Sequence, residues 1–418
     1  MADGALPTLL RLALKFATRN SPPRMAAKMG GAWRHAKSWF PSHMGKAMGE
    51  MTERIKAVDV VIEVRDCRAP ISSAARHLGK LLSEYGRTQR RLVVLNKADL
   101  VTAAHRRAAV ANLVADGHTA VHLTSARDGR GVEAMLDAAV GVVAEHSPRV
   151  LNTKQSAVAA ADGTFLPGAP GTDEVSALPL IMLVAGAPNT GKSSLINALR
   201  RACSDRHGQK LRSRKPARTG ALPGVTRGLG GFQVSVRPPV WLLDTPGVLP
   251  PRIDSWEAAL RLGALDLIKE GKGESEALGS YILHLLSRLQ PDALRLWPTA
   301  HAIATTHAEE APAAEEAEQD FEMAGAEERR AMRMLAAVAR QYELRAHREP
   351  DLANAARRII GLLRDGRLGK ICFDEQQLFG RRVSAADREA GDEVEQRYAR
   401  ARRNYRQDAA IRAFRRAT

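Results

Sequence analysis

A glycine-rich segment, G-A-P-N-T-G-K-S at 186–193, carries the strongest chemical signal in the sequence. It follows the apolar run L-P-L-I-M-L-V-A and precedes the helix-compatible run S-L-I-N-A-L-R, which is the strand–loop–helix setting of a phosphate-binding P-loop. Glycines let backbone N–H groups approach phosphate oxygens, and a helix N-terminus favours negative charge. The residues expected to contact a nucleoside phosphate are Gly186, Asn189, Thr190, Gly191, Lys192, Ser193 and Ser194.

Magnesium and the γ-phosphate have candidate partners in this segment and in two others. Lys192 is expected to reach the β- and γ-phosphates, and the Ser193 hydroxyl to bind Mg²⁺. A D-T-P-G motif follows the apolar run V-W-L-L, so that Asp244 can hold Mg²⁺ through water and the Gly247 N–H can contact the γ-phosphate. Thr226, in P-G-V-T, is expected to complete the metal coordination. Loops held through the γ-phosphate act as switches when that phosphate is released.

The base is predicted by an N-K-A-D motif that directly follows another apolar run. Asp99 can accept hydrogen bonds from N1–H and the exocyclic amine of guanine, a donor pair that adenine lacks. Asn96 would brace the loop, and the Lys97 stem would cover the ring. A buried polar group left unpaired costs about 1–3 kcal/mol, so such a site discriminates strongly against adenine. Backbone donors to guanine O6 are expected from a T-S-A motif, Thr124, Ser125 and Ala126.

The order of these motifs is unusual, because the guanine motifs precede the P-loop and D-T-P-G follows it. A sheet can keep the same spatial order of strands while its chain ends are relocated. The segment after Gly247 then leads straight into the C-terminal helices, so nucleotide state can reorient them. Val248 follows D-T-P-G where many GTPases carry a glutamine that orients the attacking water. Intrinsic hydrolysis is therefore expected to be slow.

The motifs and the apolar runs together predict an α/β fold. Its first part would be a circularly permuted P-loop GTPase domain with a mostly parallel, doubly wound sheet, and its second part an α-helical C-terminal domain. Apolar, β-branched runs are expected to be buried strands; they lie at 60–64, 91–95, 121–123, 178–186 and 240–243. The expected segments are a presequence or basic arm at 1–38, a GTPase domain at 39–250 with a flexible insertion at 151–178, a helical domain at 251–375 with an acidic insertion at 308–328, and a basic tail at 376–418.

Net charge and composition limit the classes of partner that the chain is expected to bind. The formal net charge is +17, which favours polyanions such as nucleic acid. Basic residues gather before the switch loop and again in the tail, where Tyr398 and Tyr405 lie among arginines. That composition suits RNA, and a solvated helix is the alternative for the tail. Scattered cysteines argue against a disulfide framework or zinc site, and no apolar run is long enough to span a membrane.

The N-terminal residues 1–49 contain a single acid, Asp3, and a helical stripe of Arg11, Lys15 and Arg19. A basic, acid-poor, amphipathic start is typical of a mitochondrial presequence, with cleavage expected before Trp39. An RNA-gripping basic arm is the alternative.

The chain resembles the circularly permuted GTPases of the YlqF/RbgA family, including its mitochondrial members. Besides the motifs above, the resemblance rests on W-F-P-S-H-M-G-K-A (39–47), R-D-C-R-A-P (65–70) and L-L-R-D-G-R-L-G-K (362–370). It covers about residues 35–375 without the two insertions. Ser42 stands where the family more often has glycine, and the basic segment 203–214 and the arginine tail have no counterpart.

The resemblance implies that the helical domain at 251–375 binds RNA and the ribosome, and that the whole chain is a GTPase that assembles the mitochondrial large ribosomal subunit in the matrix. Its partners would be rRNA, ribosomal proteins and other assembly factors, and it would act as a monomer; peripheral association with the inner membrane is compatible with it. It also implies that Asn189 coordinates K⁺, which would supply positive charge at the β–γ bridge as an arginine finger does. The expected catalytic residues are Lys192, Thr226, Gly247 and Asn189.

Several alternatives remain open at this point. His43 could orient water, contact RNA or simply pack. The chain could be a GTP-binding scaffold with little turnover, since Val248 removes the usual water-orienting group. It could also assemble ribosomes in the cytosol or nucleolus.

Overall fold

The computed structural model describes residues 42–146, 180–207, 220–221, 230–236, 239–244, 256–268, 275–305, 319–346 and 349–417. They divide into a sheet unit, formed within Pro41–Arg252 and Cys372–Thr418, and a helical unit, formed within Ile253–Ile371. The predicted presequence and the 151–178 insertion lie outside the described residues. Across the described helices, none is both long and apolar enough to cross a membrane.

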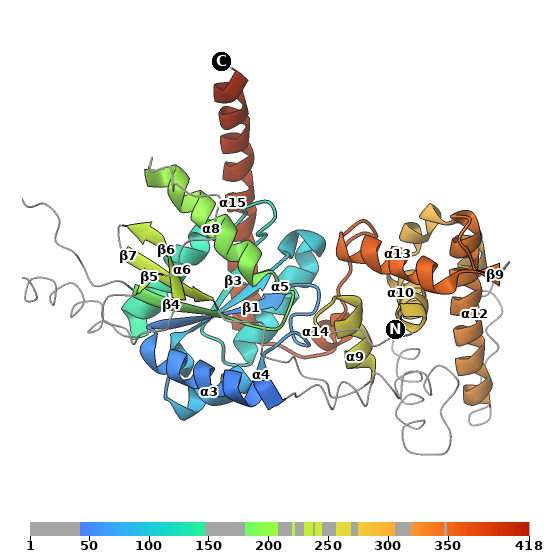
Figure 1. Ribbon diagram of the computed structural model, residues 1–418, viewed down its shortest axis with the longest axis horizontal. Coiled ribbons are helices and arrows are strands. Elements are labelled where there is room, and N and C mark those ends of the chain that lie inside the picture. The colour runs from blue at the N-terminus through green and yellow to red at the C-terminus, as the bar shows by residue number, and fades with distance from the viewer. Residues whose placement is uncertain are drawn as a thin grey trace, which may run out of the picture. The chain divides into compact units, whose positions relative to one another are not determined.

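The sheet unit is built on seven strands in the order β3-β2-β1-β4-β7-β6-β5 (Figure 1). The strands from β3 to β7 in that order run parallel, whereas β6 is antiparallel to β7 and β5 is antiparallel to β6. β1 and β4 are buried throughout, as expected for apolar runs covered on both faces. The predicted α/β fold with a mostly parallel sheet is therefore confirmed. The strands are β1 (Val60–Asp66), β2 (Arg91–Asn96), β3 (Ala120–Leu123), β4 (Leu180–Ala185), β5 (Gly220–Ala221), β6 (Gly230–Val236) and β7 (Pro239–Asp244).

Helices cover both faces of this sheet, and strand alternation decides which residues each face receives. Val61 and Leu183 pack against α3 (Ser42–Ala57) and α4 (Arg76–Glu84), which lie below the sheet in Figure 1. The neighbouring positions Ile62 and Met182 point to the opposite face. That face is covered by α6 (Val132–His146) and α8 (Lys192–His207). A third helix, α5 (Ala103–Ala115), packs against Val93 and Leu95 of β2.

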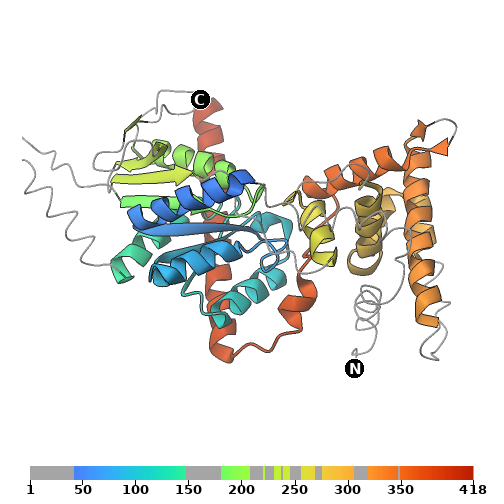
Figure 2. The ribbon, with the colours of Figure 1, turned by 60° about the horizontal axis from the view of Figure 1, so that its bottom comes forward.

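The C-terminal segment returns to the sheet unit, which differs from the expected separate tail. α14 (Glu375–Phe379) and the long helix α15 (Ala385–Ala417, red in Figures 1 and 2) both contact α5. The physical reason is a buried apolar cluster in which Cys372, Leu378 and Tyr398 join residues of β2 and α5. Side chains of α15 after residue 401, including the predicted Tyr405, lie outside the described residues.

Two sets of hydrogen bonds hold the C-terminal segment where it returns to the sheet unit. The Asp374 carboxylate accepts hydrogen bonds from the backbone N–H groups of Ile71 (2.8 Å) and Ser72 (2.9 Å). Ser384 caps α15 reciprocally, because its hydroxyl accepts from the Asp387 N–H (3.1 Å) and its own N–H donates to the Asp387 carboxylate (3.0 Å). The chain direction is thus set before α15 reaches α5.

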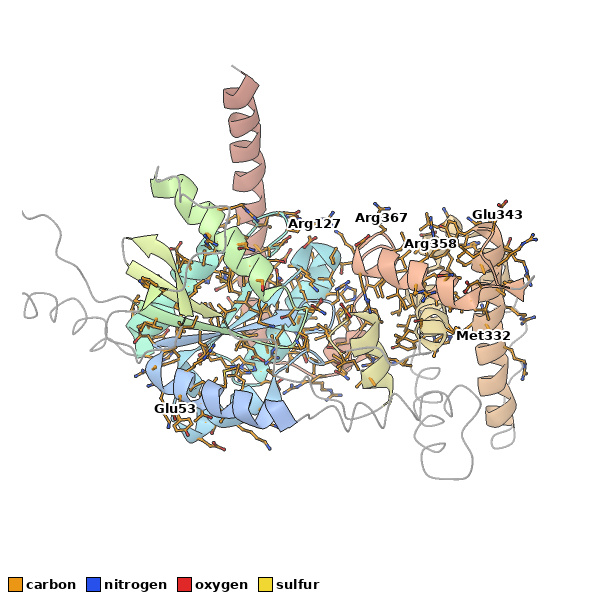
Figure 3. All side chains as sticks on the ribbon, viewed as in Figure 1. Glu53, Arg127, Met332, Glu343, Arg358 and Arg367 are labelled. Atoms are coloured by element: carbon orange, nitrogen blue, oxygen red, sulfur yellow. The ribbon has the colours of Figure 1, made fainter. Side chains whose placement is uncertain are left out.

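The helical unit packs around the fully buried Trp297, whose indole N–H donates to the Tyr342 hydroxyl (3.3 Å). Arg358, labelled in Figure 3, stacks over the Tyr342 ring at 3.9 Å. Residues 319–328 of the predicted acidic insertion form the first turns of α12. The elements are α9 (Trp256–Ala264), α10 (Ser275–Leu289), η3 (Pro291–Leu296), α11 (Pro298–Thr305), α12 (Gln319–Gln341), β8 (Arg345–Ala346), β9 (Glu349–Pro350) and α13 (Leu352–Arg364).

Gly279 of α10 sets how closely α10 and α13 approach. A Cβ at this position would lie 2.6 Å from the Ala356 Cβ, so Gly279→Ala should force the helices apart. Overpacking of this kind costs about 1–3 kcal/mol, against a gain of up to about 1 kcal/mol in helix propensity. We expect a net loss in the free energy of unfolding, measured by denaturant titration. Gly361→Ala on α13, with open space around its Cβ, is the matched control and should stabilise; equal effects would contradict this packing.

Candidate nucleotide site

The predicted phosphate loop joins β4 to α8, which begins at Lys192. Parallel strands direct their carboxyl ends to one edge of a sheet, where ligands of α/β folds bind. Glycine is required at both ends of the loop. Gly186 (φ +148°) and Gly191 (φ +93°) occupy backbone conformations that other residues rarely adopt. An added Cβ would lie 2.2 Å from the Val64 carbonyl oxygen at the first position and 2.3 Å from Asn96 Nδ2 at the second.

The side chain of Asn96, at the end of β2, joins three of the predicted motifs. Its Nδ2 donates to the Thr190 carbonyl in the phosphate loop (2.9 Å). Its Oδ1 accepts from the Ala126 N–H (3.1 Å) and from the Thr124 hydroxyl (3.3 Å) in the T-S-A loop. Arg127, directly after that loop, is labelled in Figure 3. The amide is almost fully buried, so its bonds hold the phosphate loop and both loops predicted to read the base in one arrangement.

Lys97 follows in a left-handed conformation (φ 61°), which is uncommon outside glycine. Its ammonium group bridges the Asp66 carboxylate (2.8 Å) and the Asn189 carbonyl (2.7 Å). Burial alone would raise the pKa of Asp66, but the charges of Arg68 and Lys97 hold it well below its usual range. Asp66 therefore anchors Lys97 as a carboxylate at any physiological pH.

Asp66 is a site residue that motif reasoning missed, since it appeared only within R-D-C-R-A-P. The signal in the sequence was its position just after the apolar run at 60–64. In the structure Asp66 ends β1 and pairs with Asn96 at the end of β2. A carboxylate at the end of a buried strand, beside a known loop residue, is expected to face the same edge of the sheet.

The other predicted contacts occupy the same edge in different environments. Asp99, in the short helix η2 (Ala98–Leu100), is half-buried. The Lys192 ammonium donates within its own loop, to the carbonyls of Gly186 (3.1 Å) and Ala187 (2.7 Å). Asn189 has a left-handed backbone (φ 55°) and is exposed. Ser125 is fully buried, whereas Ser193 and Ser194 are exposed at the start of α8.

The expected Mg²⁺ donors fit the metal in kind, because Mg²⁺ takes oxygen ligands from hydroxyl, carboxylate and phosphate groups. The Ser193 hydroxyl is exposed beside the phosphate loop. Asp244 ends β7 and pairs with Val184, two residues before Gly186, so its backbone lies at the same edge; its side chain is outside the described set. Thr226, Gly247 and Val248 lie outside the described residues altogether. His43 lies in α3, and its side chain is likewise not described.

One edge of the sheet thus holds the parts of a P-loop GTPase in a rotated chain order. A family model described as "50S ribosome-binding GTPase" matches residues 181–294. "Mitochondrial ribosome-associated GTPase 1" of Mus musculus is 32% identical over 275 residues, which cover 64% of this chain and 74% of the relative. "Ribosome biogenesis GTPase A" of Bacillus cereus is 30% identical over 257 residues, covering 62% and 74%. "Short integuments 2, mitochondrial" of Arabidopsis thaliana is 32% identical over 250 residues, covering 60% and 56%.

The chain belongs to the circularly permuted GTPases of the YlqF/RbgA family. It is a GTPase, which converts GTP to GDP and phosphate. The expected fold, with its permuted order of motifs, and the expected enzyme class are confirmed.

Loss of the Asn96 amide should separate the phosphate and base loops. We expect Asn96→Ala to weaken GDP binding at least about tenfold, because three hydrogen bonds of about 1 kcal/mol each are removed from a buried position. Fluorescent-GDP titration measures the change. Val93→Ala, a buried truncation in the same strand, serves as control and should lower stability without weakening GDP comparably. Equal affinity losses in the two variants would show that Asn96 acts only through stability.

Proposed function

We propose that this GTPase acts in assembly of the mitochondrial large ribosomal subunit, where it binds rRNA and ribosomal proteins in the matrix. The observation that carries this proposal is a basic helix face in the unit that follows the nucleotide-sensing strand β7. The printed names of the relatives, which include ribosome-associated and ribosome-biogenesis GTPases, support the partner. The acid-poor, basic N-terminal sequence and the mitochondrial relatives support the compartment.

The basic face belongs to α13 and the turn after it. The inward side of α13 is apolar and buried, with Ile359, Ile360 and Leu363 in contact with the unit's interior. The opposite side exposes cations, of which Arg358 and Arg367 are labelled in Figure 3. Such a face can neutralise RNA phosphates without any rearrangement of the core. The exposed cations of the α13 face are Arg357, Arg358, Arg367 and Lys370.

Replacement of Arg357, Arg358 and Arg367 by alanine should weaken binding to large-subunit particles and reduce its salt dependence. Each lost contact to single-stranded RNA phosphate lowers the slope of log K against log salt by about 0.7. Sedimentation with particles at several salt concentrations measures this. Removal of three exposed cations of the sheet unit, Lys80, Arg382 and Arg388, is the charge-matched control. An unchanged slope in the α13 variant, with binding intact, would exclude this face as the RNA contact.

The proposed chemistry assigns each residue a separate task. Lys192 would stabilise the phosphates, and the Gly247 N–H would sense the γ-phosphate. Mg²⁺ would be held by Ser193, Thr226 and Asp244. Bound K⁺ would supply positive charge at the β–γ bridge. Two observations support a role for Asn189 in that contact: its side chain is exposed in the phosphate loop, and its carbonyl accepts from Lys97. The bound particle completes the site, because Val248 cannot orient water.

Asn189→Gly isolates the proposed role of the side chain, because glycine keeps the left-handed backbone that position 189 requires. We expect particle-stimulated GTP hydrolysis in K⁺ to fall about tenfold, to the rate seen in Na⁺, with GDP affinity nearly unchanged. A variant that still responds to K⁺ would remove Asn189 from the cation site.

Wild-type protein without stimulation by particles or K⁺ would favour the scaffold alternative. A reporter carrying residues 1–40 that stays in the cytosol would remove the mitochondrial assignment.

A further inference from the structure

The C-terminal helix α15 contacts the turns that carry the base-reading motifs, although it lies beyond the stretch that resembles the family. We propose that α15 positions the guanine-recognition loops, through Glu395 and Tyr398, and that its docking is thereby coupled to guanine-nucleotide binding. This inference rests on the assignment of the N-K-A-D and T-S-A loops to guanine.

The contact begins with Arg106, a buried residue in the first turn of α5. Its Nη1 donates to the carbonyls of Ala98 (2.9 Å) and Val101 (2.8 Å). These two carbonyls lie on either side of Asp99 in the chain, so one guanidinium group clamps the turn that presents the base-reading carboxylate. A shift of Arg106 would move that turn with it.

Arg106 is in turn held by α15. Its Nε and Nη2 donate to the two carboxylate oxygens of Glu395, each at 2.7 Å. A bidentate pair of this kind fixes the plane of the guanidinium group. Both side chains are buried, and removal of one partner from such a pair leaves an uncompensated buried charge. Arg106 therefore depends on Glu395, which is 289 residues away in the sequence.

Tyr398, one turn further along α15, reaches the second loop. Its buried ring packs under the guanidinium groups of Arg106 (5.1 Å) and Arg130 (5.9 Å). The Arg130 carbonyl accepts from the Ser125 N–H of the T-S-A loop (2.9 Å). Burial raises the pKa of Tyr398 to about 12, and the charge of Asp99 acts in the same direction, which agrees with a position beside the base-reading turn.

Other contacts between α5 and α15 do not touch the loops, which separates docking from positioning. The helices approach closely at Gly391, where a Cβ would lie 2.7 Å from the Arg107 carbonyl. Arg107 and Asp392 form an exposed ion pair at 3.3 Å, with 46% and 58% of their side chains accessible. Asp392 thus offers a matched control: an acid on the same helix, paired to the same partner helix, with no bond to a base-reading turn.

Coupling between two binding events is reciprocal. If α15 holds the loops in the arrangement that binds guanine, then bound guanine nucleotide must stabilise docked α15 to the same extent. Loss of this coupling should change recognition of the base and not of the phosphates, because the bonds of Arg106 hold the turn that contains Asp99.

The test compares Glu395→Gln with Asp392→Asn in the full-length chain. Affinities for fluorescent GDP and IDP are measured, because inosine lacks the exocyclic amine that Asp99 would read. We expect Glu395→Gln to weaken GDP about tenfold and IDP less, so that the GDP/IDP preference falls, while Asp392→Asn stays within about twofold of wild type. Tyr398→Phe should also match wild type, since the Tyr398 hydroxyl makes no hydrogen bond among the described residues.

A GDP/IDP preference unchanged in Glu395→Gln would overturn the inference. Should that variant fail to fold, hydrogen exchange of the wild-type protein decides: GDP should slow exchange of amides at 385–400, and identical exchange with and without GDP would equally overturn it. Asp99→Asn tests the assignment beneath it. Loss of GDP preference in Asp99→Asn but not in Glu395→Gln rejects the coupling alone, whereas no change in Asp99→Asn rejects the guanine assignment and the inference with it.

Discussion

The buried amide of Asn96 is the interaction that joins the loops of the candidate nucleotide site. It bonds at once to the phosphate loop at Thr190 and to the T-S-A loop at Thr124 and Ala126. In the sequence the T-S-A loop lies 28 residues from Asn96 at Thr124, and the phosphate loop lies 94 residues away at Thr190. Because the sheet keeps the carboxyl ends of β1, β2 and β4 adjacent, the same amide can close the site whatever the order of the motifs.

Around that amide, charge is neutralised locally instead of being exposed. Lys97 balances Asp66, and Arg106 balances Glu395, each beside a loop whose backbone must hold a fixed shape. Buried pairs of this kind contribute little net stability but are costly to break on one side. Their value here is geometric: a carboxylate or guanidinium that cannot leave its partner keeps the adjoining turn in place.

The sequence predicted the sheet well, because apolar β-branched runs mark buried strands; the run at 60–64 became β1 and that at 91–95 became β2. The P-loop and N-K-A-D followed from fixed spacing. The docking of α15 could not be predicted, because Tyr398 is an isolated aromatic residue in a strongly charged segment that favoured RNA binding, with a solvated helix as the alternative. Pairs such as Arg106 with Glu395 leave no local pattern, and β6 lacked the continuous apolar run of a central strand.

The return of the chain at Cys372 makes the helical unit an insertion in the sheet unit, and not an appendage to it. The polypeptide leaves after β7 and re-enters where Asp374 is bonded to the backbone of Ile71 and Ser72. A unit on a single linker could swivel about it freely, whereas one tethered at both ends loses most of that rotational freedom.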